Sequence, residues 1–227
     1  DVMKSLRAIK PDIAIEFRQK YIGPAMMNFG NMFRAFDCPN DPVTNRIRTT
    51  DVKLLCGPAA VHSDPITWHP EDRIELAAIQ LINSLYSVPQ LSVHLRDTDP
   101  AFLQMIEFYT RYWSENRAVL LDGDFLPHGP LANYPLLESE LDGHRIISVH
   151  ENLVVPISNV NHQQIDIFNA SMNSSLVLRV EGEAEFWQST TYNCQGLIIQ
   201  ERELELHPGL NEFESPTAGL LRLSKKN

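Results

Sequence analysis

The 227-residue sequence has few cysteines and few basic residues. Its three cysteines, Cys38, Cys56 and Cys194, are odd in number and lack the spacing of a metal site, so we expect reduced, mostly structural thiols rather than a disulfide framework. Lysine and arginine number 19 against 29 acidic residues, which gives a net charge of −10. Because no basic stripe is present to neutralise phosphates, nucleic acid is not an expected partner.

Long apolar runs are also missing. No stretch approaches the roughly 18 apolar residues of a membrane-spanning helix, so we expect no membrane segment. The sequence is nevertheless 43% hydrophobic, which excludes a disordered chain and predicts a sizeable core in one large or two modest domains. It begins with Asp1 and no charged-then-apolar leader follows, so the sequence does not decide targeting: we expect a soluble protein, and the cytoplasm and the periplasm both stay open. A helix, a break and a strand at the start indicate a βα unit already in progress, so we expect the domain to start upstream.

The stretch 11–41 contains two short apolar runs, 13–17 and 32–36, that each end in polar groups. In the first run apolar side chains alternate with smaller or polar ones, which is typical of a strand. The groups that follow the two runs are Arg18, Gln19 and Tyr21 after the first, and Arg34 and Asp37 after the second. Buried strands with polar carboxyl ends are typical of parallel α/β sheets and barrels, so we place the chemistry here.

Helix and strand signals alternate over residues 1–125. A helix over 1–10 is stopped by Pro11, further strands are predicted over 52–57 (VKLLCG) and 91–95 (LSVHL), and helices begin at Pro70 and at Asp99-Pro100. The first of these helices has an apolar stripe that predicts its core face, at Ile74, Ala77, Ala78, Leu81, Ile82 and Leu85. The core face of the last helix includes Leu103, Ile106, Tyr109 and Trp113. Four strands alternating with helices make half of a (β/α)8 TIM barrel, and its open edges require a second half from upstream sequence or from a partner.

The pattern changes after residue 125. Three prolines between Leu126 and Pro135 suggest a linker over 126–143. Over 144–227 the sequence shows many short alternating runs separated by turn signals such as Pro208-Gly209, which predicts an antiparallel β-sandwich domain. The predicted fold class is therefore α/β plus all-β.

The order of PDIAIEF, GNMFRAFDCPND, LLCGPAAVHSD and LSVHL resembles the second half of the catalytic barrel of family 36 glycoside hydrolases, the melibiase-like α-galactosidases of clan D. In that family the general acid/base is an aspartate at the end of barrel strand six, in a W-T-S-D-type stretch. Phe33-Arg34-Ala35-Phe36-Asp37 is similar in position and character, so the resemblance implies that Asp37 has this role. The family also has a C-terminal antiparallel β-domain, and the resemblance therefore covers nearly the whole chain.

The sequence departs from the family pattern in two places. The family's glycine-rich Cys-Ser-Gly-Gly-Gly motif after strand five is replaced by Arg18-Gln19-Lys20-Tyr21, which leaves the sugar open. The strand-four end that carries the family's nucleophilic aspartate has no counterpart, so the resemblance implies a nucleophile upstream of Asp1. Asp64 is an alternative partner for Asp37, although a turn cap suits it better, and Asp41 suits a helix cap better than catalysis.

The remaining candidates are side chains that suit a carbohydrate pocket. Arginine forks can bind sugar hydroxyls or hold an aspartate, although Arg18 and Arg34 could equally make ordinary salt bridges. Trp68 can pack on a pyranose or be buried between helices. The substrate-binding residues that we predict are Arg18, Gln19, Tyr21, Arg34, His62, Asp64 and Trp68. His62, Asp64, His69 and Asp72 have spacing that a metal could use, but no His-x-His strand end accompanies them, so we predict no metal and no other cofactor.

The function that these observations favour is hydrolysis of terminal α-galactosides by double displacement with retention, acting on an α-galactoside or oligosaccharide. One alternative is a related exo-α-glycosidase such as an α-N-acetylgalactosaminidase. The other is a non-catalytic carbohydrate-binding subunit. The open barrel edge also favours self-association into a homo-oligomer.

Overall fold

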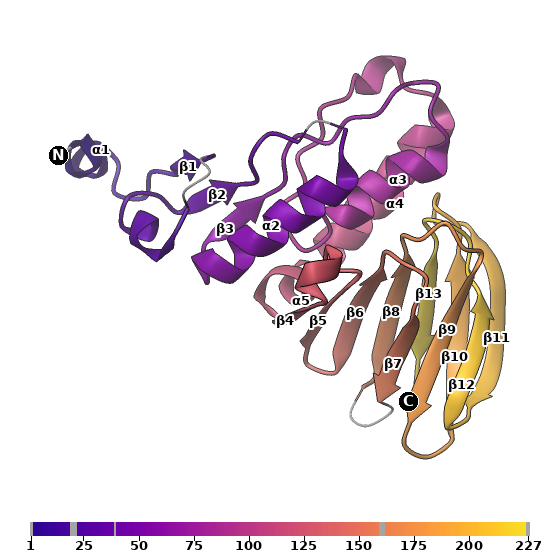
Figure 1. Ribbon diagram of the computed structural model, residues 1–227. Coiled ribbons are helices and arrows are strands. Elements are labelled where there is room, and N and C mark those ends of the chain that lie inside the picture. The colour runs from indigo at the N-terminus through magenta and orange to yellow at the C-terminus, as the bar shows by residue number, and fades with distance from the viewer. Residues whose placement is uncertain (1, 19–21, 39, 159–161, 226–227) are drawn as a thin grey trace.

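The computed structural model describes residues 2–18, 22–38, 40–158 and 162–225. A small parallel sheet lies near the N-terminus, helices follow it, and two larger sheets form the C-terminal part (Figure 1). Helix α1 (Val2–Ile9) has no buried residue, and the 3-10 turn η1 (Pro24–Asn28) connects the first two strands.

The parallel sheet contains β1 (Glu16–Phe17), β2 (Met32–Arg34) and β3 (Ala60–His62) in that order. Phe17, Phe33 and Val61 occupy equivalent positions on the three strands, so they share one face. Phe33 and Val61 are buried there against Cys56 of α2 (Pro42–Cys56). Both apolar runs of the stretch 11–41 therefore contain a strand, as the sequence predicted.

Helix α2 corrects one prediction. The run VKLLCG was expected to be the third strand, but residues 52–56 are the last turns of α2, and the third strand is β3, after the Gly57 turn. The helix begins at Asp41, whose carboxylate accepts a hydrogen bond from the backbone N–H of Thr44 at 2.9 Å, with Pro42 in the first turn. A short apolar run does not distinguish strand from helix by itself, and here the helix cap upstream at Asp41 decides.

The fourth predicted strand, 91–95, also differs. The chain does return beside β3, but only through isolated parallel bridges, from His62 to Val88 and from Ile66 to Leu91. Residues 95–97 then form the 3-10 turn η2 (Leu95–Asp97). The parallel part thus consists of three short strands and one bridged segment in sequence order.

Three further helices follow: α3 (Ile74–Asn83), α4 (Pro100–Glu115) and α5 (Arg117–Asp122). The carboxylate of Asp99 caps α4 by accepting from the N–H of Ala101 at 2.8 Å, as the sequence predicted. The expected buried faces are correct for α3, where Ala77, Ala78, Leu81 and Ile82 are buried, and for Ile106 and Tyr109 of α4. Leu103 is instead 39% exposed.

A seven-stranded sheet has the order β11-β10-β13-β8-β6-β5-β4. Its strands are β4 (Asp124–His128), β5 (Leu136–Leu141), β6 (His144–Val149), β8 (Gln164–Asn169), β10 (Glu185–Tyr192), β11 (Ile198–Leu206) and β13 (Leu220–Ser224). The predicted linker over 126–143 is wrong, because most of it forms β4, the turn η3 (Pro130–Ala132) and β5. Pro127 is accommodated because β4 is an edge strand.

A three-stranded sheet, in the order β12-β9-β7, faces the seven-stranded one. It contains β7 (Val154–Ser158), β9 (Ser175–Glu181) and β12 (Gly209–Glu214). One apolar core joins the two sheets and includes Ile147, Val155, Leu178 and Trp187. The pairing is not purely antiparallel as predicted, because β6 pairs with β8, and β7 with β9, in parallel.

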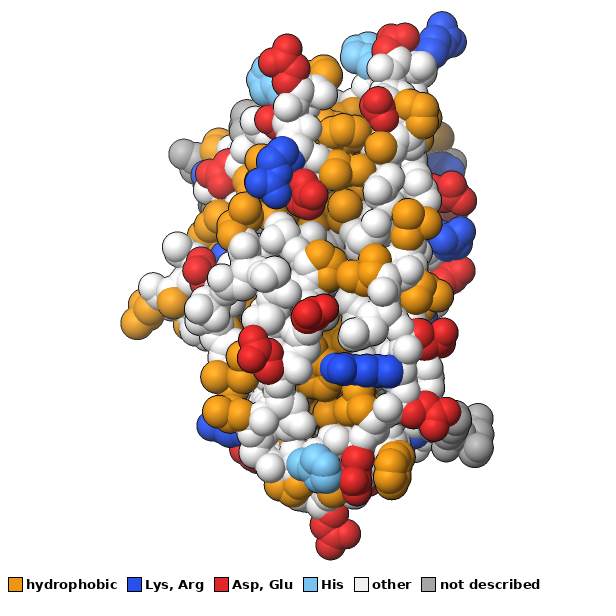
Figure 2. Space-filling model, turned by 90° about the vertical axis from the view of Figure 1, so that its right-hand side faces the viewer, with side chains coloured by type: hydrophobic (Ala, Val, Ile, Leu, Met, Phe, Trp, Pro, Cys, Tyr) orange, Lys and Arg blue, Asp and Glu red, His pale blue; other side chains and the backbone are white. Residues whose placement is uncertain are grey.

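The two sheets end at edge strands β11 and β12, which are joined by a tight turn. Figure 2 looks onto this side of the molecule and shows hydrophobic side chains between the strands, with acidic and basic side chains around them. The exposed side of β11 carries charged residues over 201–203, a feature that discourages pairing with another strand.

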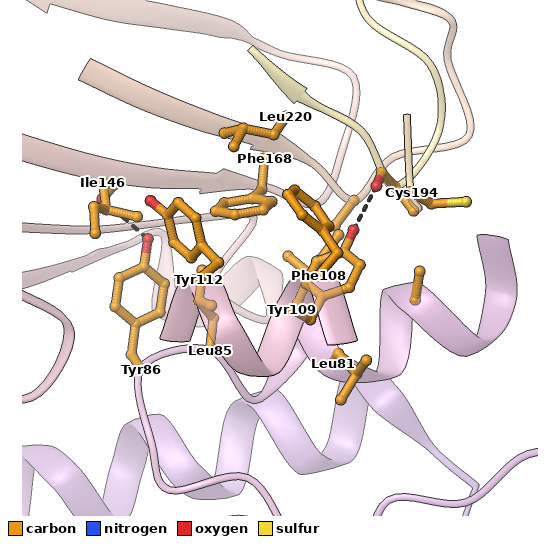
Figure 3. Close-up of a cluster of buried hydrophobic side chains, with 14 of the residues drawn as sticks. Leu81, Leu85, Tyr86, Phe108, Tyr109, Tyr112, Ile146, Phe168, Cys194 and Leu220 are labelled. Atoms are coloured by element: carbon orange, nitrogen blue, oxygen red, sulfur yellow. Dashed lines mark hydrogen bonds between the residues drawn. The ribbon is translucent and has the colours of Figure 1, made fainter. Parts of the chain in front are cut away.

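The other face of the seven-stranded sheet is covered by helices. Successive residues of one strand enter different cores, since Ile146 and Phe168 pack under the helices while Ile147 and Ile167 pack between the sheets. The ring of Tyr112 meets that of Phe168 edge to face at 4.8 Å (Figure 3). The hydroxyl of Tyr86 donates to the carbonyl of Ile146 at 3.0 Å. The central strands of the seven-stranded sheet, such as β6 and β8, are therefore buried on both faces. No helix of the described part of the chain is both long and apolar enough to cross a bilayer.

Candidate functional site

Asp37 lies in the loop that follows β2, the middle strand of the parallel sheet. Its Oδ2 accepts a hydrogen bond from Nη2 of Arg18 at 3.1 Å, and Arg18 follows the neighbouring strand β1. Both side chains are about half exposed, 56% for Arg18 and 51% for Asp37. The two parallel strands thus bring together, at their carboxyl ends, two of the residues that the sequence singled out.

The backbone around Asp37 is held from two sides. Nη1 of Arg48, on α2, donates to the carbonyl of Phe36 at 2.7 Å and to that of Asp37 at 2.5 Å, and its guanidinium lies 5.1 Å from the centre of the Phe36 ring. On the other side, Oδ2 of Asp64 accepts from the backbone N–H of Cys38 at 2.7 Å. These contacts fix the peptides before and after Asp37, so its carboxylate has a defined position at the surface.

Asp64 is only 3% exposed, and its backbone is tied to α2. The side chain of Asn45 accepts from the N–H of Asp64 at 3.1 Å and donates to its carbonyl at 3.3 Å. Because one of its carboxylate oxygens accepts the hydrogen bond from the Cys38 N–H, Asp64 holds the loop that carries Asp37 in place. Its carboxylate therefore binds a backbone N–H of the loop after β2, far away in the sequence, and not one of its own turn as the capping alternative had it.

A cavity of about 290 Å³ opens at the carboxyl ends of the parallel strands. The residues that line it are Arg18, Arg34, Asp37, Asp64, Pro65, Thr67 and Ser92. Nε of Arg34 is buried and has no hydrogen-bond partner among the described residues. An unpaired buried donor is costly, and the side chain that carries it also lines the cavity. Four of the predicted site residues share this cavity.

His62 lies apart from these four residues. Its Nδ1 is 2.6 Å from Oε1 of Glu16 and 3.1 Å from Nε2 of Gln90. Glu16 and His62 alternate with Phe17 and Val61 along their strands and so lie on the sheet face that α2 does not cover. The structure therefore assigns His62 to a polar cluster on that face rather than to the wall of the Asp37 cavity.

Trp68 lines a second cavity, of about 540 Å³, beside the start of α4. Its ring stacks on that of Phe102, with centroids 6.1 Å apart and planes at 27°. The two remaining predictions, Gln19 and Tyr21, lie outside the described residues. The site residues predicted from the sequence are thus divided between the Asp37 cavity, the polar cluster and the cavity of Trp68.

All three cysteines are free and buried. Burial, and after it the charge of Asp64, raise the pKa of the Cys38 thiol to about 12, so this neighbour of Asp37 is not a nucleophile at neutral pH. Asp41 caps α2, as the sequence favoured. No group of three or more His, Cys, Asp or Glu side chains in the described ranges is arranged to hold a metal ion.

Sequence reasoning missed the residues that hold the Asp37 loop from α2, Arg48 and Asn45. It also missed Gln90, because the segment that carries it does not form the predicted strand. Asp41-Pro42 is a strong helix-start signal just upstream of Arg48. To predict that Arg48 lies on the face of α2 toward β2, one would also have needed the correct length of that helix. Glu16 carried a signal, since it is the one charged side chain inside the alternating run 13–17.

Comparisons with known proteins support the fold. A scan against protein-family models finds no match, and a search of curated proteins finds none either. Among solved structures, the galactosidase domain of the α-galactosidase-sucrose kinase AgaSK matches 99% of the chain with a TM-score of 0.53 and 12% identity. A doubly substituted family 36 α-galactosidase AgaA from Geobacillus stearothermophilus, in complex with stachyose, matches 98% of it with a TM-score of 0.55 and 12% identity.

The chain spans 30% of the length of each of these two structures. At 12% identity the similarity concerns the fold alone. Because nearly the whole chain is matched, the similarity includes both the parallel sheet with its helices and the two C-terminal sheets. The resemblance noted in the sequence is thus confirmed at the level of the fold: the chain has the fold of a part of the family 36 α-galactosidases.

Proposed function

We propose that this chain is part of a retaining α-glycosidase that cleaves terminal α-galactosides, with Asp37 as its general acid/base. The observation that carries the proposal is the position of Asp37. It lies in a cavity at the carboxyl ends of parallel strands, in a fold shared with α-galactosidases. Carboxyl ends of parallel strands are where barrel enzymes hold their catalytic residues.

In the proposed reaction the protonated carboxyl of Asp37 donates its proton to the glycosidic oxygen as the bond to the anomeric carbon breaks. A second carboxylate attacks that carbon and forms a glycosyl-enzyme. Asp37, now ionised, takes a proton from water, which attacks the same carbon and releases the sugar with retained configuration. Retention needs the two carboxyl groups about 5 Å apart, and we propose that the second one comes from sequence upstream of this chain.

Two arginines would support these steps. Arg18 holds Oδ2 of Asp37, and Oδ1 accepts no hydrogen bond from the described residues, so it is available to the leaving oxygen. Arg34 lines the same cavity, and its guanidinium suits a sugar hydroxyl or ring oxygen. Asp64 acts through the backbone of the Asp37 loop and not on the substrate.

The proposal extends to the architecture. The parallel strands and the bridged segment at Val88 would be the second half of a (β/α)8 barrel, and the two facing sheets would be the β-sandwich domain that follows it. The polar cluster of Glu16, His62 and Gln90 then faces the barrel interior, because α2 covers the opposite face. Upstream strands would close the barrel over this cluster.

The test is hydrolysis of p-nitrophenyl α-galactoside by the full-length protein, by its Asp37→Asn variant and by residues 1–227 alone. We expect activity in the full-length protein, a loss of at least about a hundredfold in kcat/KM with Asp37→Asn, and none in the isolated chain. Asp41→Asn is the matched control, because asparagine also caps a helix and Asp41 is only four residues away.

A full-length protein that cleaves α-N-acetylgalactosaminides and not α-galactosides would favour the related exo-glycosidase, with the residues after β1 selecting the sugar. A protein that cleaves no α-glycoside would contradict the hydrolase and favour a carbohydrate-binding subunit. Full activity in Asp37→Asn would remove Asp37 from the mechanism.

A further inference from the structure

Arg46, in the second turn of α2, is a buried cation that binds no carboxylate among the described residues. It is 3% exposed. Its Nε and Nη2 donate to the carbonyl of Asn133 at 3.1 and 2.9 Å, and its Nη1 donates to Oδ1 of Asn83 at 2.7 Å. Burial lowers the pKa of the guanidinium to about 10, against a smaller opposing effect of the Glu151 charge, so Arg46 stays protonated at neutral pH. A buried charge held only by neutral acceptors is costly, so stability alone does not explain it.

The acceptor of Arg46 lies in the turn that joins β4 to β5, residues 129–135, which we call the β4–β5 turn. Asn133 and Tyr134 follow each other there with left-handed backbones, at φ values of 60° and 54°. Side chains other than glycine rarely adopt this conformation, and it persists only where the surroundings fix it. The hydroxyl of Tyr134 donates to Oδ1 of Asp51, on α2, at 2.6 Å. The turn is therefore fastened to α2 at two points.

Two neighbours of Arg46 on α2 hold the loops of the Asp37 cavity. Asn45, the residue before it, binds the N–H and the carbonyl of Asp64. Arg48, two residues after it, binds the carbonyl of Asp37 and that of the residue before. Because these side chains come from a single helical turn, a displacement of α2 at Arg46 moves both of them.

Arg46 is also joined to the Asp37 loop through α3. Its partner Asn83 is the last residue of that helix. Three residues earlier on α3, Nε2 of Gln80 donates to Oδ1 of Asn40 at 3.0 Å, and Asn40 lies three residues after Asp37. Both helices that contact the loop are thus held by one guanidinium, which binds the β4–β5 turn.

We propose that Arg46 is a positioning residue for the reaction: by fastening α2 and α3 to the β4–β5 turn, it sets the place of the Asp37 carboxyl relative to the substrate. The inference rests on the proposed function. Arg46 does not line the cavity of Asp37, so its effect passes through the loop. A general acid acts only within hydrogen-bond reach of the leaving oxygen, and a small shift of the loop therefore weakens protonation. In this way the large sheet takes part in catalysis.

The experiment compares two substrates of the full-length protein that differ in their need for an acid. Fluoride leaves α-galactosyl fluoride as a stable anion, whereas methanol leaves methyl α-galactoside only with a proton from Asp37. We expect Arg46→Lys to lower the ratio of kcat/KM for the methyl glycoside to that for the fluoride on the order of tenfold, because lysine keeps the charge but not the paired hydrogen bonds. Asp37→Asn gives the upper limit of this effect.

A second variant acts on the other link between the turn and α2. Tyr134→Phe removes the hydrogen bond to Asp51 and keeps the ring, and we expect it to lower the same ratio by about threefold. If Arg46→Lys does not fold, this variant decides. An unchanged ratio in Tyr134→Phe would then overturn the positioning role.

Two further variants are matched controls. Asn133→Gly keeps the backbone carbonyl that Arg46 binds, and glycine adopts a left-handed backbone readily, so the ratio should not change. Ile157→Val removes a buried methyl group between the two facing sheets, so it should lower stability and leave the ratio unchanged. Equal losses on both substrates in Arg46→Lys, or no loss on either, would overturn the positioning role and leave the proposed function intact.

An active protein in which Asp37→Asn does not change the ratio would refute the proposed function, as would a wild type that cleaves neither substrate. Hydrogen exchange of the Cys38 N–H, which donates to Asp64, then decides whether Arg46 holds the loop. Faster exchange in Arg46→Lys than in both wild type and Ile157→Val would still show that Arg46 positions the loop. Equal exchange in the three proteins would overturn it.

Discussion

Asp166 is a fully buried carboxylate in β8, under helix α4, and it shows how single residues hold the layers together. Arg222 binds it with two hydrogen bonds of 2.8 Å, from Nε to Oδ1 and from Nη2 to Oδ2. The hydroxyl of Tyr112 donates to Oδ2 at 2.7 Å, and Nε2 of His144 lies 3.2 Å from the same oxygen. One carboxylate thus joins two other strands and a helix.

The pKa of Asp166 follows from these partners. Burial alone raises the pKa, but the hydrogen bonds from Arg222 and His144 outweigh it and lower the value from 3.8 to about 2. The folded protein therefore binds this proton less readily than the unfolded chain. The stability that the carboxylate contributes is complete above 3.8 and is lost as the pH falls from 3.8 toward about 2.

Asp166→Asn is expected to lower the free energy of unfolding by roughly 3–5 kcal/mol at pH 7, because it removes a fully buried charge from its network and leaves the partly buried Arg222 without its counter-charge. The measurement is urea unfolding of wild type and variant at pH 7 and at pH 2, and the difference between them should shrink at the lower pH. Glu107→Gln is the control, since the exposed pair with Arg111 contributes less than about 1 kcal/mol. A difference that does not change with pH would contradict the role of the ionised carboxylate.

Among elements, α2 is the helix that carries the contacts of the Asp37 loop. Asp41 begins it with hydrogen bonds to both the N–H and the hydroxyl of Thr44, and Arg48 reaches from its middle to the loop. The aspartates at 37 and 41 therefore have different tasks, four residues apart. One would act in catalysis and the other starts a helix.

We expect Asp41→Ala to reduce stability by about 1 kcal/mol, because the first turn of α2 loses its cap, and Asp41→Asn to reduce it by much less. Asp37→Ala should leave stability nearly unchanged, since among the described residues its side chain bonds only to the exposed Arg18. Thermal unfolding midpoints of the three variants of the full-length protein measure this. Equal losses for Asp37→Ala and Asp41→Ala would refute the distinction.

The elements show where sequence reasoning succeeds. The strand in each of the runs 13–17 and 32–36, the caps at Asp41 and Asp99 and the buried stripe of α3 were predictable, since each has a local signal in periodicity or capping chemistry. Arg18, Arg34, Asp37 and Asp64 were predictable as neighbours, because carboxyl ends of adjacent parallel strands meet at one edge.

Other elements depend on distant contacts. Residues 52–56 are apolar enough for a strand but continue a helix already capped at Asp41, and β3 has only Val61 as a large apolar residue. The prolines between 126 and 135 suggested a linker because Pro127 breaks a central strand, yet an edge strand tolerates it. That Trp68 lies with Phe102 and not with Asp37 follows from the packing of α4, which no local pattern reports.

At the scale of the whole molecule, the seven-stranded sheet belongs to two cores. One lies under the helices and contains Tyr109 and Cys194, and the other lies between the sheets and contains Trp187. Because β5, β6, β8 and β13 supply side chains to both, neither core can be lost without exposing the other.

We therefore expect these two cores to unfold together. In urea, labelling of the buried Cys194 thiol and the fluorescence of Trp187 should report the same midpoint. Replacing Trp68 and Trp113 by phenylalanine isolates the Trp187 signal, and replacing Cys38 and Cys56 by alanine isolates the labelling of Cys194. Two separate midpoints would show that the helical layer and the facing sheets are independent units.

Residues 124–141 form a pair of strands and not a hinge, and this bears on how such a chain can be dissected or inherited. A boundary after residue 125 would cut β4 and leave the helices without the sheet that they cover. A gene fragment for the strands alone would therefore encode a protein with one apolar face uncovered. The transferable unit includes α3, α4 and α5, so recombination that respects folding has to exchange the sheets together with their helices.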